Sequence, residues 1–149
     1  FPGYKKGAKF NYQYKSALSR LAAKGCVVFV EKDGKRYARI TEKGKRMLQM
    51  ETEKTAIAKK RRWDRRWRVV IFDIPERRKS VRVSLRRFME EYGFVRLQNS
   101  VWIYPYDCED LVALAKTNLR LGADVLYMIV ERLERDNYLR EHFSLPLSD

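Results

Sequence analysis

The sequence contains few of the residues that usually carry enzyme chemistry. Of its 149 residues, one is a histidine and two are cysteines. Cys26 and Cys108 have no metal-ligand spacing, and we expect both to be free, buried thiols of a reducing cytoplasm. We expect His142, in a polar tail, to be a surface residue. The sequence has no glycine-rich phosphate loop, C-x-x-C motif or Ser-His-Asp arrangement, so the usual signatures of zinc sites, nucleotide hydrolysis and triad hydrolases are excluded.

Long hydrophobic runs and a signal-peptide pattern are also absent. No stretch of about 18 or more apolar residues, the length that a bilayer requires, occurs in the chain. The hydrophobic content of 45% and the aromatic content of 13% are too high for a disordered chain. We therefore expect a folded cytoplasmic protein with no membrane partner. Because the first residue is phenylalanine, we expect a fragment or a processed product.

Acidic residues are scarce in the first part of the chain only. Residues 1–66 carry 20 Lys or Arg against 6 Asp or Glu, whereas residues 67–149 carry 13 of each kind. The net charge of +14 therefore lies entirely before residue 67. Release of counterions from a polyphosphate is the commonest use of such a field, so a nucleic acid is the predicted partner. A basic solubilising surface is the alternative.

The basic part predicts a helix, a hairpin and a second helix. Tyr14, Leu18 and Leu21 recur at helical spacing within residues 10–24, and Gly25 supplies a left-handed stop. Residues 26–41 predict a β-hairpin around Asp33-Gly34, and Thr41 can cap the helix that follows over residues 42–60. The side of the first helix away from its apolar stripe carries donors suited to phosphates and base edges.

A charged segment over residues 59–68 predicts the domain boundary, because charge density peaks there while hydrophobic periodicity disappears. We expect one domain over residues 1–62 and a second over residues 63–149. Trp63 and Trp67 lie in this segment, and their preference for burial predicts that they help to dock the two parts.

The second part predicts the element order βαββαβ. The predicted elements are strands at 67–74, 94–98, 100–105 and 124–131, and helices at 77–92 and 108–121. A ferredoxin-like sandwich, with both helices on one face of an antiparallel sheet, is the compact solution for this order, so the predicted fold class is α+β. The strands are apolar on both sides, so we expect the second face of the sheet to meet another sheet in a homodimer. The tail, residues 137–149, could add an edge strand to the partner.

Two stretches carry family resemblances. Helix, hairpin and the turn ARITEKGKRM in residues 10–48 resemble the latter half of a winged helix-turn-helix domain, whose earlier helices would lie outside this chain. From Trp67 onward, VVIFDIPE and YGFVRLQNSVWIYP resemble the ferredoxin-like small subunit of CRISPR adaptation complexes. They also resemble the central domain of the phenylacetic acid repressor (PaaX) family, in which such a domain follows a winged helix. The resemblance implies a dimeric transcriptional regulator, with room for a small-molecule effector.

Asp73 ends the strand WRVVIF and has two interpretations. In the CRISPR-associated nucleases, the acid at this position is the metal ligand, so the resemblance implies a catalytic Asp73 that binds Mg²⁺ across a dimer axis. Such a protein would be a metal-dependent endonuclease or would work beside a CRISPR integrase. The other interpretation is that Asp73 accepts hydrogen bonds at the start of the following helix. The candidates for phosphate contact near it are Arg77, Arg78 and Ser100.

We expect the protein to bind double-stranded DNA through its basic part, with no cofactor required. A helix would enter the major groove and the tip of the hairpin would meet the backbone or the minor groove, and a symmetric dimer would read a palindrome. The predicted DNA-binding residues are Asn11, Lys15, Ser16, Arg20, Lys32, Lys35, Arg36 and Lys43.

Overall fold

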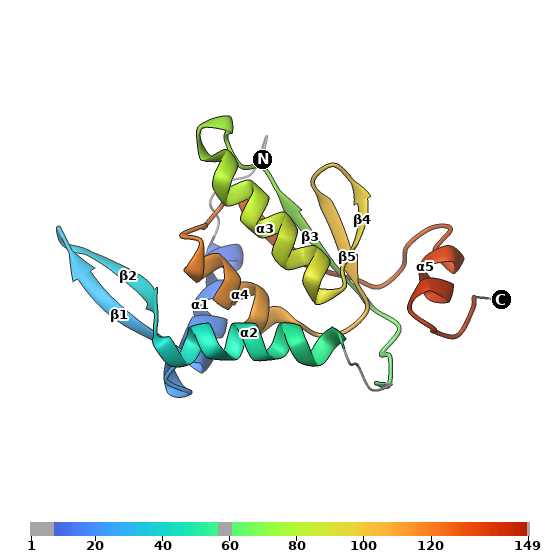
Figure 1. Ribbon diagram of the computed structural model, residues 1–149, viewed down its shortest axis with the longest axis horizontal. Helices are drawn as coiled ribbons and strands as arrows, with labels where there is room; N and C mark the ends of the chain where they lie inside the picture. The colour runs from blue at the N-terminus through green and yellow to red at the C-terminus, as the bar shows by residue number, and fades with distance from the viewer. Residues whose placement is uncertain (1–7, 57–60, 149) are drawn as a thin grey trace.

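The computed structural model describes residues 8–56 and 61–148, in two antiparallel sheets and a set of helices (Figure 1). The helices are α1 (Ala8–Ala23), α2 (Glu42–Ala56), α3 (Lys79–Tyr92), α4 (Glu109–Asn118) and α5 (Asn137–His142), with the 3-10 turn η1 (Glu76–Arg78). The strands are β1 (Val27–Lys32), β2 (Lys35–Ile40), β3 (Trp67–Phe72), β4 (Val95–Gln98), β5 (Val101–Tyr104) and β6 (Val125–Val130). Within the described residues, no helix has the length and apolar character needed to cross a bilayer.

The larger sheet has the strand order β4-β5-β3-β6, with every neighbouring pair antiparallel. With α3 between β3 and β4 and α4 between β5 and β6, this is the split βαβ sandwich that the element order predicts. The positions of the strands and of both helices agree with the sequence-based ranges within a few residues. Gly93, which ends α3 with φ 105°, adopts the left-handed conformation expected of a helix stop.

One face of the larger sheet packs against α3 and α4. Alternation along the strands directs Val70 and Phe72 of β3 toward this face, where they meet Leu85 and Met89 of α3. Trp102 of β5 joins the same cluster, and all five side chains are at most 2% exposed. This cluster is the main core of the molecule.

The second face of the sheet is partly covered by the chain's own tail, which corrects the expectation of an edge strand. The tail forms α5 instead of an edge strand, and Leu139 and Leu145 pack on Trp67 and Val69 of β3. The tail is held by Asp136, which is 6% exposed and accepts hydrogen bonds from Trp67 Nε1 at 2.9 Å and from Arg140 Nε at 3.0 Å.

Elements α1, β1, β2 and α2 form the N-terminal unit, from which the hairpin projects away from the rest of the molecule (Figure 1). Thr41 caps α2 as predicted, because its Oγ1 accepts the Gly44 N–H at 3.0 Å. The core of this unit is shared with the sandwich. Leu18 and Leu21 of α1 pack in one buried cluster with Ala113 and Leu114 of α4.

Candidate nucleic-acid interface

The hairpin β1-β2 presents cations beside exposed apolar side chains. Its register pairs Lys32 with Lys35 at the tip, followed on the same face by Val30 with Tyr37 and by Val28 with Arg39. Tyr37 is 48% exposed and Val28 is 41% exposed, although both are large apolar groups. This face combines positive charge, which attracts the phosphates of a nucleic acid, with exposed apolar side chains.

The opposite face of the hairpin carries Arg36, whose guanidinium lies 4.3 Å from the ring centroid of Phe29. Glu31 is directly across the strand pair from Arg36. Phe29 is 37% exposed. The structure therefore brings Lys32, Lys35 and Arg36 together at one exposed tip, as the sequence predicts.

The predicted DNA-binding residues of α1 do not all lie on one free surface. Lys15 is exposed and Ser16 is half-buried, whereas the guanidinium of Arg20 contacts a carboxylate of α4. The side chain of Asn11 lies outside the described part. Lys43 is exposed in the first turn of α2. Lys15 and Lys43 thus combine with the hairpin as exposed cations, whereas the exposed guanidinium of Arg20 is paired with Asp110.

Asp73 lies opposite Asp124, an acidic residue that sequence reasoning missed. The Asp73 N–H donates to the Asp124 carbonyl at 2.9 Å, and the β3-β6 register, which pairs Phe72 with Val125, places the two residues opposite each other. Strand pairing could have revealed this neighbour, but its register is not visible in the sequence. The N-cap residues of η1 and α3, Pro75 and Arg78, make no side-chain capping hydrogen bond, and a capping role for Asp73 stays a prediction. Among the described residues, no cluster of three or more metal-ligating side chains occurs.

The phosphate-contact candidates near Asp73 have different surroundings. Arg78 donates from Nη2 to the carbonyls of Leu119 and Arg120, each at 3.2 Å, and so caps the end of α4. Arg77 is exposed. Ser100 lies near Asp73 in the sheet, because its carbonyl accepts the Phe72 N–H at 3.1 Å.

A separate groove of about 840 Å³ runs between the start of β3 and the tail. We call it the aromatic groove. It is lined by Arg61, Arg62, Trp63, Arg65, Tyr92, Gly93, Tyr104, Tyr106, His142, Phe143, Ser144, Leu145 and Pro146. The guanidinium of Arg61 lies 5.3 Å from the ring centroid of Tyr106, and burial raises the pKa of Tyr104, which keeps that phenol neutral. No acidic side chain is among these described lining residues.

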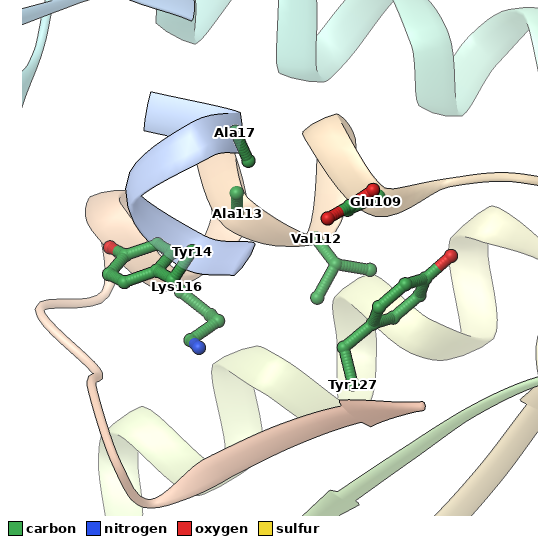
Figure 2. A pocket seen from close by; sticks show the side chains of 7 residues that line it. All are labelled: Tyr14, Ala17, Glu109, Val112, Ala113, Lys116 and Tyr127. Atoms are coloured by element: carbon green, nitrogen blue, oxygen red, sulfur yellow. The ribbon is translucent and has the colours of Figure 1, made fainter. Parts of the chain in front are cut away.

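A small cavity of about 30 Å³ lies where α1 meets α4 (Figure 2). Lys116 lines it and is 4% exposed; its Nζ lies 4.2 Å from the ring centroid of Tyr14 and donates to the Val125 carbonyl at 3.3 Å. Burial lowers the pKa of Lys116 from 10.5 to about 8, because the charged amine loses hydration. Glu109 and Tyr127 also line the cavity, and burial raises the pKa of each.

The buried amine predicts an unusual pH dependence of stability. Between pH 8 and pH 10, the unfolded chain holds a proton on Lys116 that the folded chain has lost. The free energy of unfolding should therefore rise with pH in this window, by up to about 1.4 kcal/mol per pH unit. We expect Lys116→Met to remove the rise and to be more stable than the wild type at pH 7, as measured by urea unfolding across this range. A wild type and a variant with parallel profiles would contradict the assignment.

The strand order and the placement of α3 and α4 on one face of the larger sheet define an α+β protein with a ferredoxin-like domain. Within that class, the model of the PaaX protein central Cas2-like domain matches residues 60–140. This match spans more than half of the chain, which therefore belongs to the PaaX family.

Similarity to other known proteins is slight. No curated protein matches the chain. Among solved structures, the chain is similar to an uncharacterized protein, Rv0674 from Mycobacterium tuberculosis, with 21% identity and a TM-score of 0.43. The alignment covers 95% of this chain and 53% of that one, so the chain spans about half the length of that protein.

Proposed function

We propose that this protein is a DNA-binding transcriptional regulator of the PaaX type. The observation that carries the proposal is the projecting hairpin, which concentrates exposed cations and exposed apolar side chains on a protein whose entire charge excess lies before residue 67. Helix α1 followed by the hairpin and α2 has the element order of the latter half of a winged helix. Double-stranded DNA would meet Lys15 on α1, the tip of the hairpin and Lys43 on α2.

Dimerisation through the second face of the larger sheet is part of the proposal. The part of this face beyond the tail carries a row of half-buried apolar residues, Val101, Ile71 and Leu126, aligned across β5, β3 and β6. We call these residues the apolar row. An apolar sheet surface that its own chain leaves partly open favours a second copy of the same surface. Two copies would present two hairpins, so a palindromic site is expected.

The double substitution Lys35→Ala and Arg36→Ala tests the DNA-binding surface. We expect weaker binding to all duplex sequences, because these residues would neutralise phosphates and would not read bases. The plot of log affinity against log salt concentration should become shallower by about 0.9 for each phosphate contact that is lost. Fluorescence anisotropy with labelled duplex DNA at several salt concentrations measures both quantities.

Arg87→Ala with Arg132→Ala is the matched control, because it removes the same charge from two exposed positions of the neutral half. We expect the control to leave the slope nearly unchanged. Equal slopes for the hairpin variant and the wild type would remove the hairpin from the interface.

A metal-dependent endonuclease is the second candidate, and the adjacency of Asp73 and Asp124 favours it. Mg²⁺ needs one or two carboxylates together with water and phosphate oxygens, so this pair could serve as its ligands. We expect weak or no cleavage of single-stranded RNA and duplex DNA in the presence of Mg²⁺ or Mn²⁺. Cleavage that Asp73→Ala abolishes would establish the nuclease and overturn this expectation.

We place the small-molecule effector of such a regulator in the aromatic groove. Guanidinium groups bind anions, and aromatic rings bind planar groups, so the lining suits a molecule that contains both. A ligand in the groove should change the fluorescence of Trp63, and a titration with no such change would contradict the placement.

A further inference from the structure

Helix α1 lies antiparallel along α4, with two polar contacts that lie near the two ends of α4. Tyr14, near the middle of α1, contacts Thr117 near the end of α4. Arg20, toward the end of α1, contacts Asp110 in the first turn of α4. Leu18, between these contacts, and Leu21, next to Arg20, are buried in one cluster with Ala113 and Leu114. Figure 2 shows Ala17 of α1 and Ala113 of α4 beside the small cavity.

The contact between Tyr14 and Thr117 is directional. The Tyr14 hydroxyl and Thr117 Oγ1 are 3.0 Å apart, and Thr117 Oγ1 donates to the Ala113 carbonyl at 2.9 Å. Because the threonine hydroxyl has one hydrogen, Tyr14 must be the donor between the two hydroxyls. The Lys116 amine lies over the face of the same ring. The Tyr14 side chain is thus held by a hydrogen bond at its hydroxyl and by the Lys116 amine over the face of its ring.

The contact at the other end is an ion pair. Arg20 donates from Nε at 3.0 Å and from Nη2 at 2.8 Å to Asp110 Oδ1, and Nη2 lies 3.5 Å from Glu109 Oε2. The Asp110 hydrogen bond raises the pKa of Arg20. Lys24 adds a longer contact, with Nζ at 3.9 Å from Asp110 Oδ2.

These polar contacts serve orientation more than stability. The side chains of Arg20 and Asp110 are 46% and 32% exposed, and ion pairs as exposed as this one add little to folding. Tyr14 and Arg20 are six residues apart, which is about 9 Å along a helix, and the apolar side chains between them would tolerate rotation. Two directional contacts at that separation fix the axis of α1 relative to α4.

We propose that the Tyr14–Thr117 and Arg20–Asp110 contacts set which separation of two DNA half-sites a dimer accepts. This inference rests on the proposed function. Helix α4 belongs to the sandwich that carries the apolar row, so the orientation of α1 on α4 fixes the N-terminal unit relative to the dimer axis. Arg20 and Asp110 are positioning residues, and Lys15, on the exposed part of α1, is the nearer candidate for DNA contact.

The test is selection of half-site separations from a pool of duplex DNA containing two half-sites at variable distance. We expect the wild type to disfavour a separation changed by half a helical turn, about 5 base pairs, by at least about tenfold. The double variant Tyr14→Phe with Asp110→Ala should lower this ratio to below about threefold while its affinity for a single half-site is unchanged. Sedimentation and thermal unfolding confirm that each variant is a folded dimer.

Two further variants make the test specific to the contact. With Tyr14 unchanged, Arg20→Asp combined with Asp110→Arg restores an ion pair of reversed polarity. This variant should recover the preference for one half-site separation. Glu141→Ala removes an exposed acid elsewhere in the chain and should retain the wild-type preference for half-site separation. Unchanged selectivity in the double variant would overturn the proposal. Tighter binding of the double variant to a single half-site would also overturn it, because α4 would then compete with DNA for α1. A wild type that enriches no DNA would instead overturn the proposed function itself.

Discussion

Gly44→Ala should destabilise the protein by up to about 2 kcal/mol, although alanine is the better helix former. Gly44 lies in the first turn of α2, where a Cβ atom would collide with the carbonyl oxygen of Cys26 and would lie 2.7 Å from Ile40 Cγ1. Cys26 is fully buried, and its carbonyl accepts the Thr41 N–H at 3.0 Å, so this backbone cannot move aside without breaking the cap of α2. Helix propensity favours alanine by about 1 kcal/mol, but forcing an atom into a packed backbone contact costs about 1 to 3 kcal/mol or more.

Urea unfolding monitored by circular dichroism measures this effect. Gly122→Ala is the matched control, because a Cβ at Gly122 would meet nothing within 4 Å. We expect the control to lie within about 0.5 kcal/mol of the wild type. If Gly44→Ala were as stable as this control, the close approach of α2 to the Cys26 carbonyl would be wrong.

Asp136→Ala should cost about 3 kcal/mol and release the tail from the second face of the sheet. The side chains of Asp136 and Arg140 are only 8% and 14% exposed, so the substitution leaves a nearly buried guanidinium without its partner. It also removes the acceptor of the Trp67 indole N–H. Arg140 lies over Trp63 as well, at 4.9 Å from a ring centroid, so the loss should reach the Trp63–Trp67 pair.

The release can be observed separately from the loss of stability. Proteolysis after the tail loosens should cut near α5, and the tryptophan fluorescence should shift to longer wavelength in the folded variant. Glu76→Ala is the control, since it breaks an ion pair to Arg82 in which the glutamate is 77% exposed, a kind of pair that contributes little. Equal stabilities of the two variants would show that Asp136 does not hold the tail.

The order of elements could be predicted because it depends on local patterns. Alternating apolar residues, glycine stops and the Asp33-Gly34 turn are short-range signals, and the structure has each corresponding element near its expected place. The tail forms a helix where the sequence predicts an edge strand, because the apolar residues Tyr138, Leu139 and Phe143 do not by themselves distinguish the two. In the structure Asp136 pairs with Arg140 four residues later, a spacing that belongs to a helix.

The surroundings of the candidate site residues could not be predicted, because they depend on contacts between distant segments. Arg20 and Asp110 are 90 residues apart in sequence, and no local pattern joins them. The adjacency of Asp73 and Asp124 requires the register of β3 on β6. The cluster of basic residues at the hairpin was predictable, since all of its members lie within a few residues of one turn.

The buried cluster shared by α1 and α4 has a consequence for how the molecule opens. Ala113 and Leu114 complete the core of the N-terminal unit while their helix also closes the sandwich. Opening either part therefore exposes apolar surface of the other, and the free energies of the two opening events are coupled. Amide hydrogens of α1 and α4 should therefore exchange with solvent at the same free energy of opening. The N-terminal unit and the sandwich would then behave as a single cooperative unit, although the chain passes between them only once.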